Sequence, residues 1–133
     1  MIIDKQEDVT AAIEWVKKKH PGKKLFVGGF SFGSWVSSRV ACELPEVDAL
    51  FLIGTPVNKY DFGYLRHCER PILFIHGTQD DHGDVAKLEK LIPTVRNAES
   101  VIVTGADHFF TKQLEAVEET IRAWAEEVVQ QTA

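Results

Sequence analysis

The sequence has little of several features that would mark a specialised class of protein. It holds only two cysteines, Cys42 and Cys68, which lack the spacing of a metal site and are too few for a disulfide framework, so we expect reduced thiols. It has no uncharged apolar run of about 18 residues, so no membrane span is predicted. The N-terminus is acidic and lacks the basic and apolar regions of a signal peptide. We therefore expect a cytoplasmic protein.

Positive charge is also scarce. Fifteen Lys and Arg residues stand against 20 Asp and Glu residues, which gives a formal net charge of −5 and argues against a nucleic-acid-binding surface. The one basic cluster, residues 16–24, is expected to be the solvated end of a helix, where cations suit the helix dipole. A length of 133 residues predicts a single domain, residues 1–133. Neither nucleic acid nor a membrane is an expected partner.

What the sequence does have is an alternation of short apolar runs with segments of helical pattern. Val9, Ala12, Ile13 and Val16 fall at the i, i+3, i+4, i+7 spacing of an amphipathic helix. Short buried strands separated by helices indicate an α/β fold, with three α/β/α layers and a mostly parallel sheet of about four strands. The expected strands are residues 24–29, 47–54, 71–77 and 99–105, and the other expected helices are residues 33–44, 84–95 and 111–130.

The first expected strand leads directly into Gly29-Phe30-Ser31-Phe32-Gly33, which fits the G-x-S-x-G pattern of a nucleophile elbow. Such a turn holds its central residue in a strained backbone conformation, and small flanking residues avoid clashes there. The hydroxyl then points toward a helix N-terminus, whose free N–H groups can hold an oxyanion. The alternative is that Ser31 is a turn serine that only lets the helix pack closely on the sheet.

Polar residues also follow the third and fourth expected strands, where ligands of parallel sheets collect. Asp80 and Asp81 follow the third strand, and His108 follows the fourth. A serine hydroxyl needs a base, usually an imidazole held in one tautomer by a carboxylate, and the order Ser–Asp–His is that of the α/β hydrolases. Two alternatives stay open: Asp81 competes with Asp80, and His108 could be a loop histidine that caps the last helix.

Two further histidines lie close to these positions in the sequence. His76 ends an apolar strand and is expected to be buried and hydrogen-bonded. His82 is expected to lie in a solvated loop, and the alternative is that it reaches the site. Asp80, His82 and His108 do not have the H-x-H or H-E-x-x-H spacing of a metal site. We therefore expect neither a metal nor a cofactor.

The stretches GGFSFGSWV, GTPVNKYDF, ILFIHGTQD and GADHFF resemble the C-terminal part of an α/β hydrolase of the small, dienelactone-hydrolase-like kind. The resemblance implies that Ser31 is the nucleophile, that His108 is the general base, and that Asp80, at the H-G-x-x-D position, orients the imidazole. It also implies that the Phe32 backbone N–H is one oxyanion donor. The strands that usually precede the nucleophile strand in this family are missing from the sequence. The loop that carries the second oxyanion donor, which follows one of those strands, is missing with them.

These observations predict a serine hydrolase that cleaves carboxylic esters through an acyl-enzyme, with thioesters and peptides left open. Tyr60 and Phe110 flank the motifs at strand ends and are expected to line the substrate site, where an apolar wall suits short acyl esters. An unpaired first strand would expose an apolar edge, so we expect a homodimer or larger assembly. The alternative is a truncated, weakly active or inactive domain that serves as a small-ligand binding or oligomerisation module.

Overall fold

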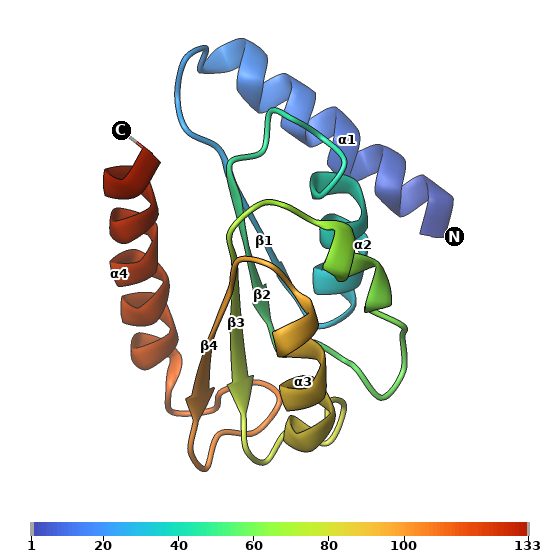
Figure 1. Cartoon of the computed structure of the whole chain (residues 1–133), viewed down its shortest axis with the longest axis vertical. Helices are drawn as coiled ribbons and strands as arrows, with labels where there is room; N and C mark the ends of the chain where they lie inside the picture. The colour runs from blue at the N-terminus through green and yellow to red at the C-terminus, as the bar shows by residue number, and fades with distance from the viewer. Residues whose placement is uncertain (1, 133) are drawn as a thin grey trace.

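The computed structural model describes residues 2–132 of the chain, which form a parallel sheet between two layers of helices (Figure 1). This is the predicted fold class. Each expected strand and helix is present, with ends that differ by a few residues. In chain order the elements are α1 (Ile2–Lys19), β1 (Phe26–Phe30), α2 (Phe32–Ala41), β2 (Ala49–Ile53), β3 (Ile72–Gly77), α3 (Val85–Leu91), β4 (Ala98–Val103) and α4 (Leu114–Thr132), with 3₁₀ turns at Gly63–His67 and Ile92–Thr94.

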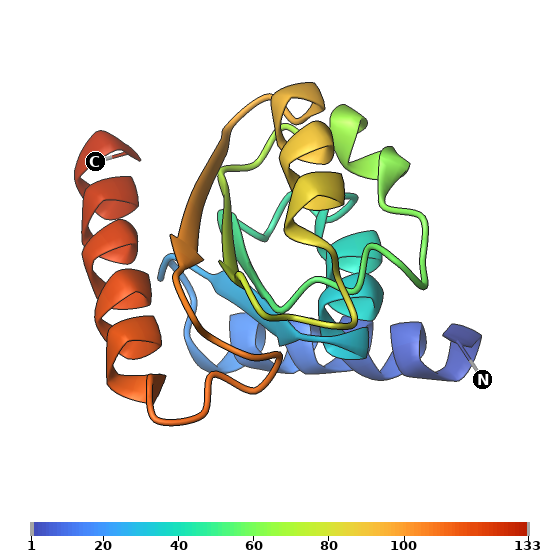
Figure 2. The same ribbon diagram turned by 90° about the horizontal axis from the view of Figure 1, so that it is seen from below.

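The four strands run parallel in the order β1-β2-β3-β4. Because parallel crossovers are almost always right-handed, strands added in one direction place their connections on one face of the sheet. The two views agree with this rule: α2 and α3 lie on one face with α1 beside α2, and α4 lies alone on the other (Figure 1, Figure 2). All strand carboxyl ends therefore meet at one edge of the sheet, the lower edge in Figure 1.

The hydrophobic core has one cluster on each face of the sheet, because successive strand residues point to opposite sides. Leu50, Leu52 and Phe74 belong to the cluster beneath α1, α2 and α3. Leu73 and Ile75 belong to the cluster beneath α4. The sheet is thus covered on both faces in its centre, which explains why its strands read as continuous apolar runs rather than as alternating ones.

Helix α2 rests directly on the backbone of β1. A Cβ atom added to Gly29 would overlap the Gly33 carbonyl oxygen and the Ser37 hydroxyl, so only glycine permits this approach. The expectation that small residues serve the turn is confirmed at Gly29. At Gly33 a small residue is not needed for packing, because a Cβ atom there would meet nothing within 4 Å.

The two cysteines are joined in a Cys42–Cys68 disulfide, so the expectation of reduced thiols is wrong. The residues are 26 positions apart, and the fold brings the C-cap of α2 against the segment that follows the Gly63–His67 turn. Spacing alone could not indicate this approach. Disulfides persist mainly in oxidising compartments, so this disulfide does not support the predicted cytoplasmic location. That location stays a prediction. Among residues 2–132, no helix combines the length and the apolarity needed to cross a bilayer.

Candidate active site at the carboxyl edge of the sheet

Ser31 is the single residue between β1 and α2, and its backbone is strained. Its φ of 56° and ψ of −125° lie in a region that L-residues rarely adopt. The conformation is held from both sides, because the Ser31 N–H donates to the Ile53 carbonyl at 2.9 Å and the Ser31 carbonyl accepts from the Ser34 N–H at 2.9 Å. The predicted elbow geometry is therefore confirmed.

Three of the predicted residues lie in one hydrogen-bonded row. The Ser31 Oγ atom lies 2.8 Å from His108 Nε2, and His108 Nδ1 lies 2.8 Å from Asp80 Oδ2. The His108 and Asp80 side chains are buried. Since the carboxylate can only accept, Nδ1 carries a proton and Nε2 has a lone pair free for the serine hydroxyl. The row can therefore pass a proton from Ser31 to His108.

Asp80, and not Asp81, faces the imidazole. Asp80 Oδ1 accepts hydrogen bonds from the backbone N–H groups of His82 at 2.8 Å and Gly83 at 3.1 Å, which leaves Oδ2 for His108. Three donors thus satisfy this buried carboxylate. The Asp81 side chain is exposed and turns toward the His82 ring, 3.6 Å from its Nε2. The alternative in which Asp81 orients His108 is wrong.

His108 is presented by a tight turn and does not cap the last helix. Asp107 Oδ1 accepts from the backbone N–H groups of Thr111 at 2.9 Å and Phe109 at 3.2 Å, and Oδ2 accepts from the Thr111 hydroxyl at 2.8 Å. These hydrogen bonds lower the pKa of the Asp107 carboxyl below its usual range, and the two from Thr111 have the largest effect. Helix α4 begins only at Leu114, and both His108 ring nitrogens are occupied by Ser31 and Asp80.

Rings surround His108. Those of His82, Phe30 and Phe109 lie 4.2, 5.1 and 5.1 Å from it, measured between ring centroids. The structure favours the alternative in which His82 reaches the site over that of a solvated loop residue, because its ring lies against the His108 ring at an interplanar angle of 45°. These rings help to shield the His108 imidazole from solvent.

Phe110 does not line this site, contrary to the sequence prediction. It is 2% exposed and packs in the core cluster beneath α4. Its φ of 54° reverses the chain, so that successive side chains point to opposite sides of the turn. Phe109, 63% exposed, is the one that lies beside His108. Sequence distance from His108 could not separate the two phenylalanines.

Tyr60 lies on the α2 side of Ser31. Its ring stacks on Trp35 at 4.3 Å and lies 5.7 Å from Phe32, again between centroids. The Trp35 Nε1–H donates to the Asp61 carbonyl at 3.3 Å, which holds the segment after β2 against the start of α2. Tyr60 thereby adjoins Phe32, whose backbone N–H opens helix α2 and has no acceptor within the helix.

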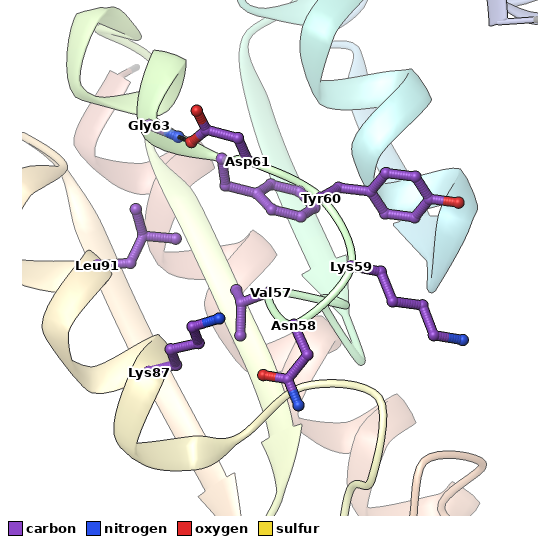
Figure 3. A pocket seen from close by; sticks show the side chains of 9 residues that line it. Val57, Asn58, Lys59, Tyr60, Asp61, Gly63, Lys87 and Leu91 are labelled. Carbon is purple, nitrogen blue, oxygen red and sulfur yellow. Dashed lines mark hydrogen bonds between the residues drawn. The ribbon is translucent and has the colours of Figure 1, made fainter.

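A hollow of about 430 Å³ lies behind this segment, between residues 57–63 and α3. In Figure 3, Lys87 and Leu91 border it on one side, whereas the Tyr60 ring points to the other side of the segment. Ser31, Asp80 and His108 do not line this hollow. Among residues 2–132, no group of three or more His, Cys, Asp or Glu side chains is arranged to hold a metal ion.

The chain is similar to proteins of one family. Residues 3–133 match the family model described as an alpha/beta hydrolase domain. An uncharacterised protein of Rickettsia prowazekii is 31% identical over 124 residues, which cover 86% of this chain and 52% of that protein. The chain thus spans about half the length of this curated relative.

Solved structures similar to this chain belong to the same kind of protein. A serine hydrolase without a lid from Xanthomonas campestris is 31% identical with a TM-score of 0.76, over 90% of this chain and 56% of that one. A serine hydrolase homologue from Coxiella burnetii is 27% identical with a TM-score of 0.80, over 96% of this chain and 58% of that one. The resemblance stated from the sequence is therefore confirmed: this chain belongs to the α/β hydrolase family.

Proposed function

We propose that this protein is a serine hydrolase that cleaves carboxylic esters, with Ser31 as nucleophile, His108 as general base and Asp80 as the group that orients the imidazole. The observation that carries the proposal is the hydrogen-bonded row from Ser31 Oγ through His108 to Asp80 Oδ2, with both distances at 2.8 Å. Its position at a strained strand-to-helix turn adds support, since such strain is kept mainly where function needs it.

The chemistry follows from the hydrogen-bond directions. Ser31 Oγ forms a bond to the ester carbonyl carbon as its proton moves to His108 Nε2, and the carbonyl oxygen becomes an oxyanion facing the Phe32 N–H. The carbon–alkoxide bond then breaks, and His108 returns the proton to the leaving alcohol. Water repeats the sequence on the acyl-enzyme, with its proton taken by His108, and frees the acid and Ser31.

Aromatic side chains on both sides of Ser31 support an apolar ester as substrate. Phe32 and Tyr60 lie on the side of the proposed oxyanion donor, and Phe30 and Phe109 lie on the side of His108. The general acid must reach the leaving oxygen, so the alcohol belongs beside His108 and the acyl group beside Phe32. Short acyl esters fit such an open, apolar surface, and Tyr60 is the substrate-lining residue that we retain.

Fluorophosphonate labelling tests the proposal directly, because the reagent requires an activated serine. We expect one stoichiometric adduct on Ser31, located by peptide mass spectrometry, and no adduct in Ser31→Ala. Ser100→Ala is the matched control, because Ser100 is an exposed serine of β4, and it should label like the wild type. An absence of adduct on the folded wild-type protein would overturn the proposal and favour a non-catalytic binding module.

We also propose that two copies of the chain associate through β1. In the described part of the chain, both β1 and β4 are paired on one side only. The β4 edge carries exposed Glu99 and Ser100, whereas β1 has no polar side chain and leaves Phe30 42% exposed. An apolar edge strand without charges favours pairing with a strand of another chain. In a dimer with a two-fold axis, the two β1 strands would pair antiparallel.

Light scattering after size-exclusion chromatography checks this association. We expect twice the monomer mass, and a return to the monomer mass in Val27→Lys, which places a charge on β1. Ala98→Lys, at the start of the other edge strand, should stay dimeric. A monomer mass for the wild type at every concentration would contradict the proposal.

A further inference from the structure

The His76 imidazole lies next to the proposed active site but takes no part in the row of hydrogen bonds from Ser31. It occupies the penultimate position of β3 and is fully buried. Its Nε2 atom lies 2.5 Å from the Gly83 carbonyl oxygen and 3.6 Å from Asp80 Oδ2. The expectation that His76 is buried and hydrogen-bonded is confirmed. Its neighbours raise the question of what the ring does there.

Gly83 is held from two directions. Its N–H donates to Asp80 Oδ1 at 3.1 Å, and its carbonyl accepts from His76 Nε2 at 2.5 Å. A Cβ atom on Gly83 would overlap the Thr55 carbonyl oxygen and crowd the His76 ring, so this backbone sits tightly between the ends of β2 and β3. Gly83, whose N–H helps to fix the Asp80 carboxylate, is thereby tied to the sheet through His76.

The tautomer of His76 follows from its partners. A carbonyl oxygen only accepts, so Nε2 carries the proton. His76 Nδ1 has no hydrogen-bond partner among residues 2–132, so a proton there would be a buried, unpaired donor. Both observations favour the neutral ring. A neutral His76 leaves the negative charge of Asp80 free to stabilise a positively charged His108. A positively charged His76 would compete with His108 for that carboxylate.

We propose that His76 is a positioning residue: as the neutral Nε2–H tautomer it fixes the segment that carries Asp80, so that Oδ2 faces His108. This inference rests on the proposed function of Ser31, His108 and Asp80. The titratable groups that bear on it are Asp80, His108 and the His82 ring that packs against His108.

Two substitutions test the proposal in the full chain. His76→Phe keeps a planar ring without the N–H, whereas His76→Gln can place an amide N–H near the position of Nε2. We expect His76→Phe to lower kcat for ethyl butyrate by about 10- to 100-fold, since small misplacements of catalytic groups are costly. We expect His76→Gln to recover most of that loss.

The pH profile separates positioning from general stability. A displaced Asp80 stabilises the His108 imidazolium less, so in His76→Phe the acidic limb of kcat/KM should move to lower pH. An acidic limb unchanged from that of the wild type would overturn the inference, even if the melting temperature fell. If the wild type is neither labelled by the fluorophosphonate nor hydrolyses ethyl butyrate, the proposed function itself is wrong. That outcome differs from an unchanged acidic limb in an active enzyme, which would overturn only the role of His76.

The wild-type protein gives an independent test that does not depend on a variant that folds. The ¹⁵N chemical shifts of His76 at neutral pH should show a protonated Nε2 and an unprotonated Nδ1. A protonated Nδ1, alone or in an imidazolium, would contradict the proposal.

Discussion

Replacing Asp80 with asparagine is expected to lower kcat/KM for ethyl butyrate by about 10⁴-fold, as removal of a tautomer-fixing carboxylate does in serine hydrolases. The structure gives the reason. The amide oxygen of the new side chain would keep the two bonds from the His82 and Gly83 N–H groups, which leaves the amide nitrogen facing His108. That nitrogen donates, so His108 would present a lone pair at Nδ1 and a proton at Nε2. It could then no longer accept the proton of Ser31.

Initial rates from pH-stat titration of the released acid measure this effect. Asp81→Asn is the matched control, because it removes a neighbouring carboxylate that does not contact His108. It should leave kcat/KM within a few-fold of the wild type. Equal losses in the two variants would contradict the assigned role, and so would an Asp80→Asn protein with wild-type activity.

Replacing His108 with alanine is the second change with a large expected effect. It removes both the base that accepts the Ser31 proton and the acid that protonates the leaving alcohol, so we expect a loss of about 10⁴-fold or more for ethyl butyrate. A 4-nitrophenyl ester should lose less, because its leaving phenoxide does not require protonation. The ratio of the two rates therefore reports the acid role of His108 separately from its role as base.

His82→Ala serves as the matched control for this variant. The His82 ring packs 4.2 Å from the His108 ring and bears the same functional group, yet it lies outside the hydrogen-bonded row. Its removal should change activity only a few-fold. Added imidazole should restore part of the His108→Ala activity by filling the space left by the ring. Full activity in His108→Ala without imidazole would overturn the proposed mechanism.

The class of fold and three residues of the candidate site could be predicted from the sequence. Continuous apolar runs showed the buried parallel strands, because a sheet covered on both faces leaves no polar alternation. Ser31, Asp80 and His108 each follow a strand directly, and parallel strands end at the same edge of the sheet. Local pattern and topology together were therefore enough to place these side chains near one another.

Contacts between segments distant in the sequence needed the tertiary structure. The Cys42–Cys68 disulfide joins segments whose approach depends on how α2 meets the chain after β2. The choice of Phe109 over Phe110 depends on the positive φ of Phe110, which a single sequence does not reveal for a non-glycine residue. The place of His76 beside Asp80 depends on the path of residues 78–83.

The sequence by itself determined which chemical groups this protein brings to the edge of its sheet, since strand periodicity and turn chemistry are local properties. Only the tertiary structure decided their directions: which carboxylate faces His108, which phenylalanine is exposed, and which ring holds Gly83. Those directions arise from turns whose backbone angles are set by many packing and hydrogen-bond contacts at once. Such contacts join residues far apart in the chain, and no local pattern records them.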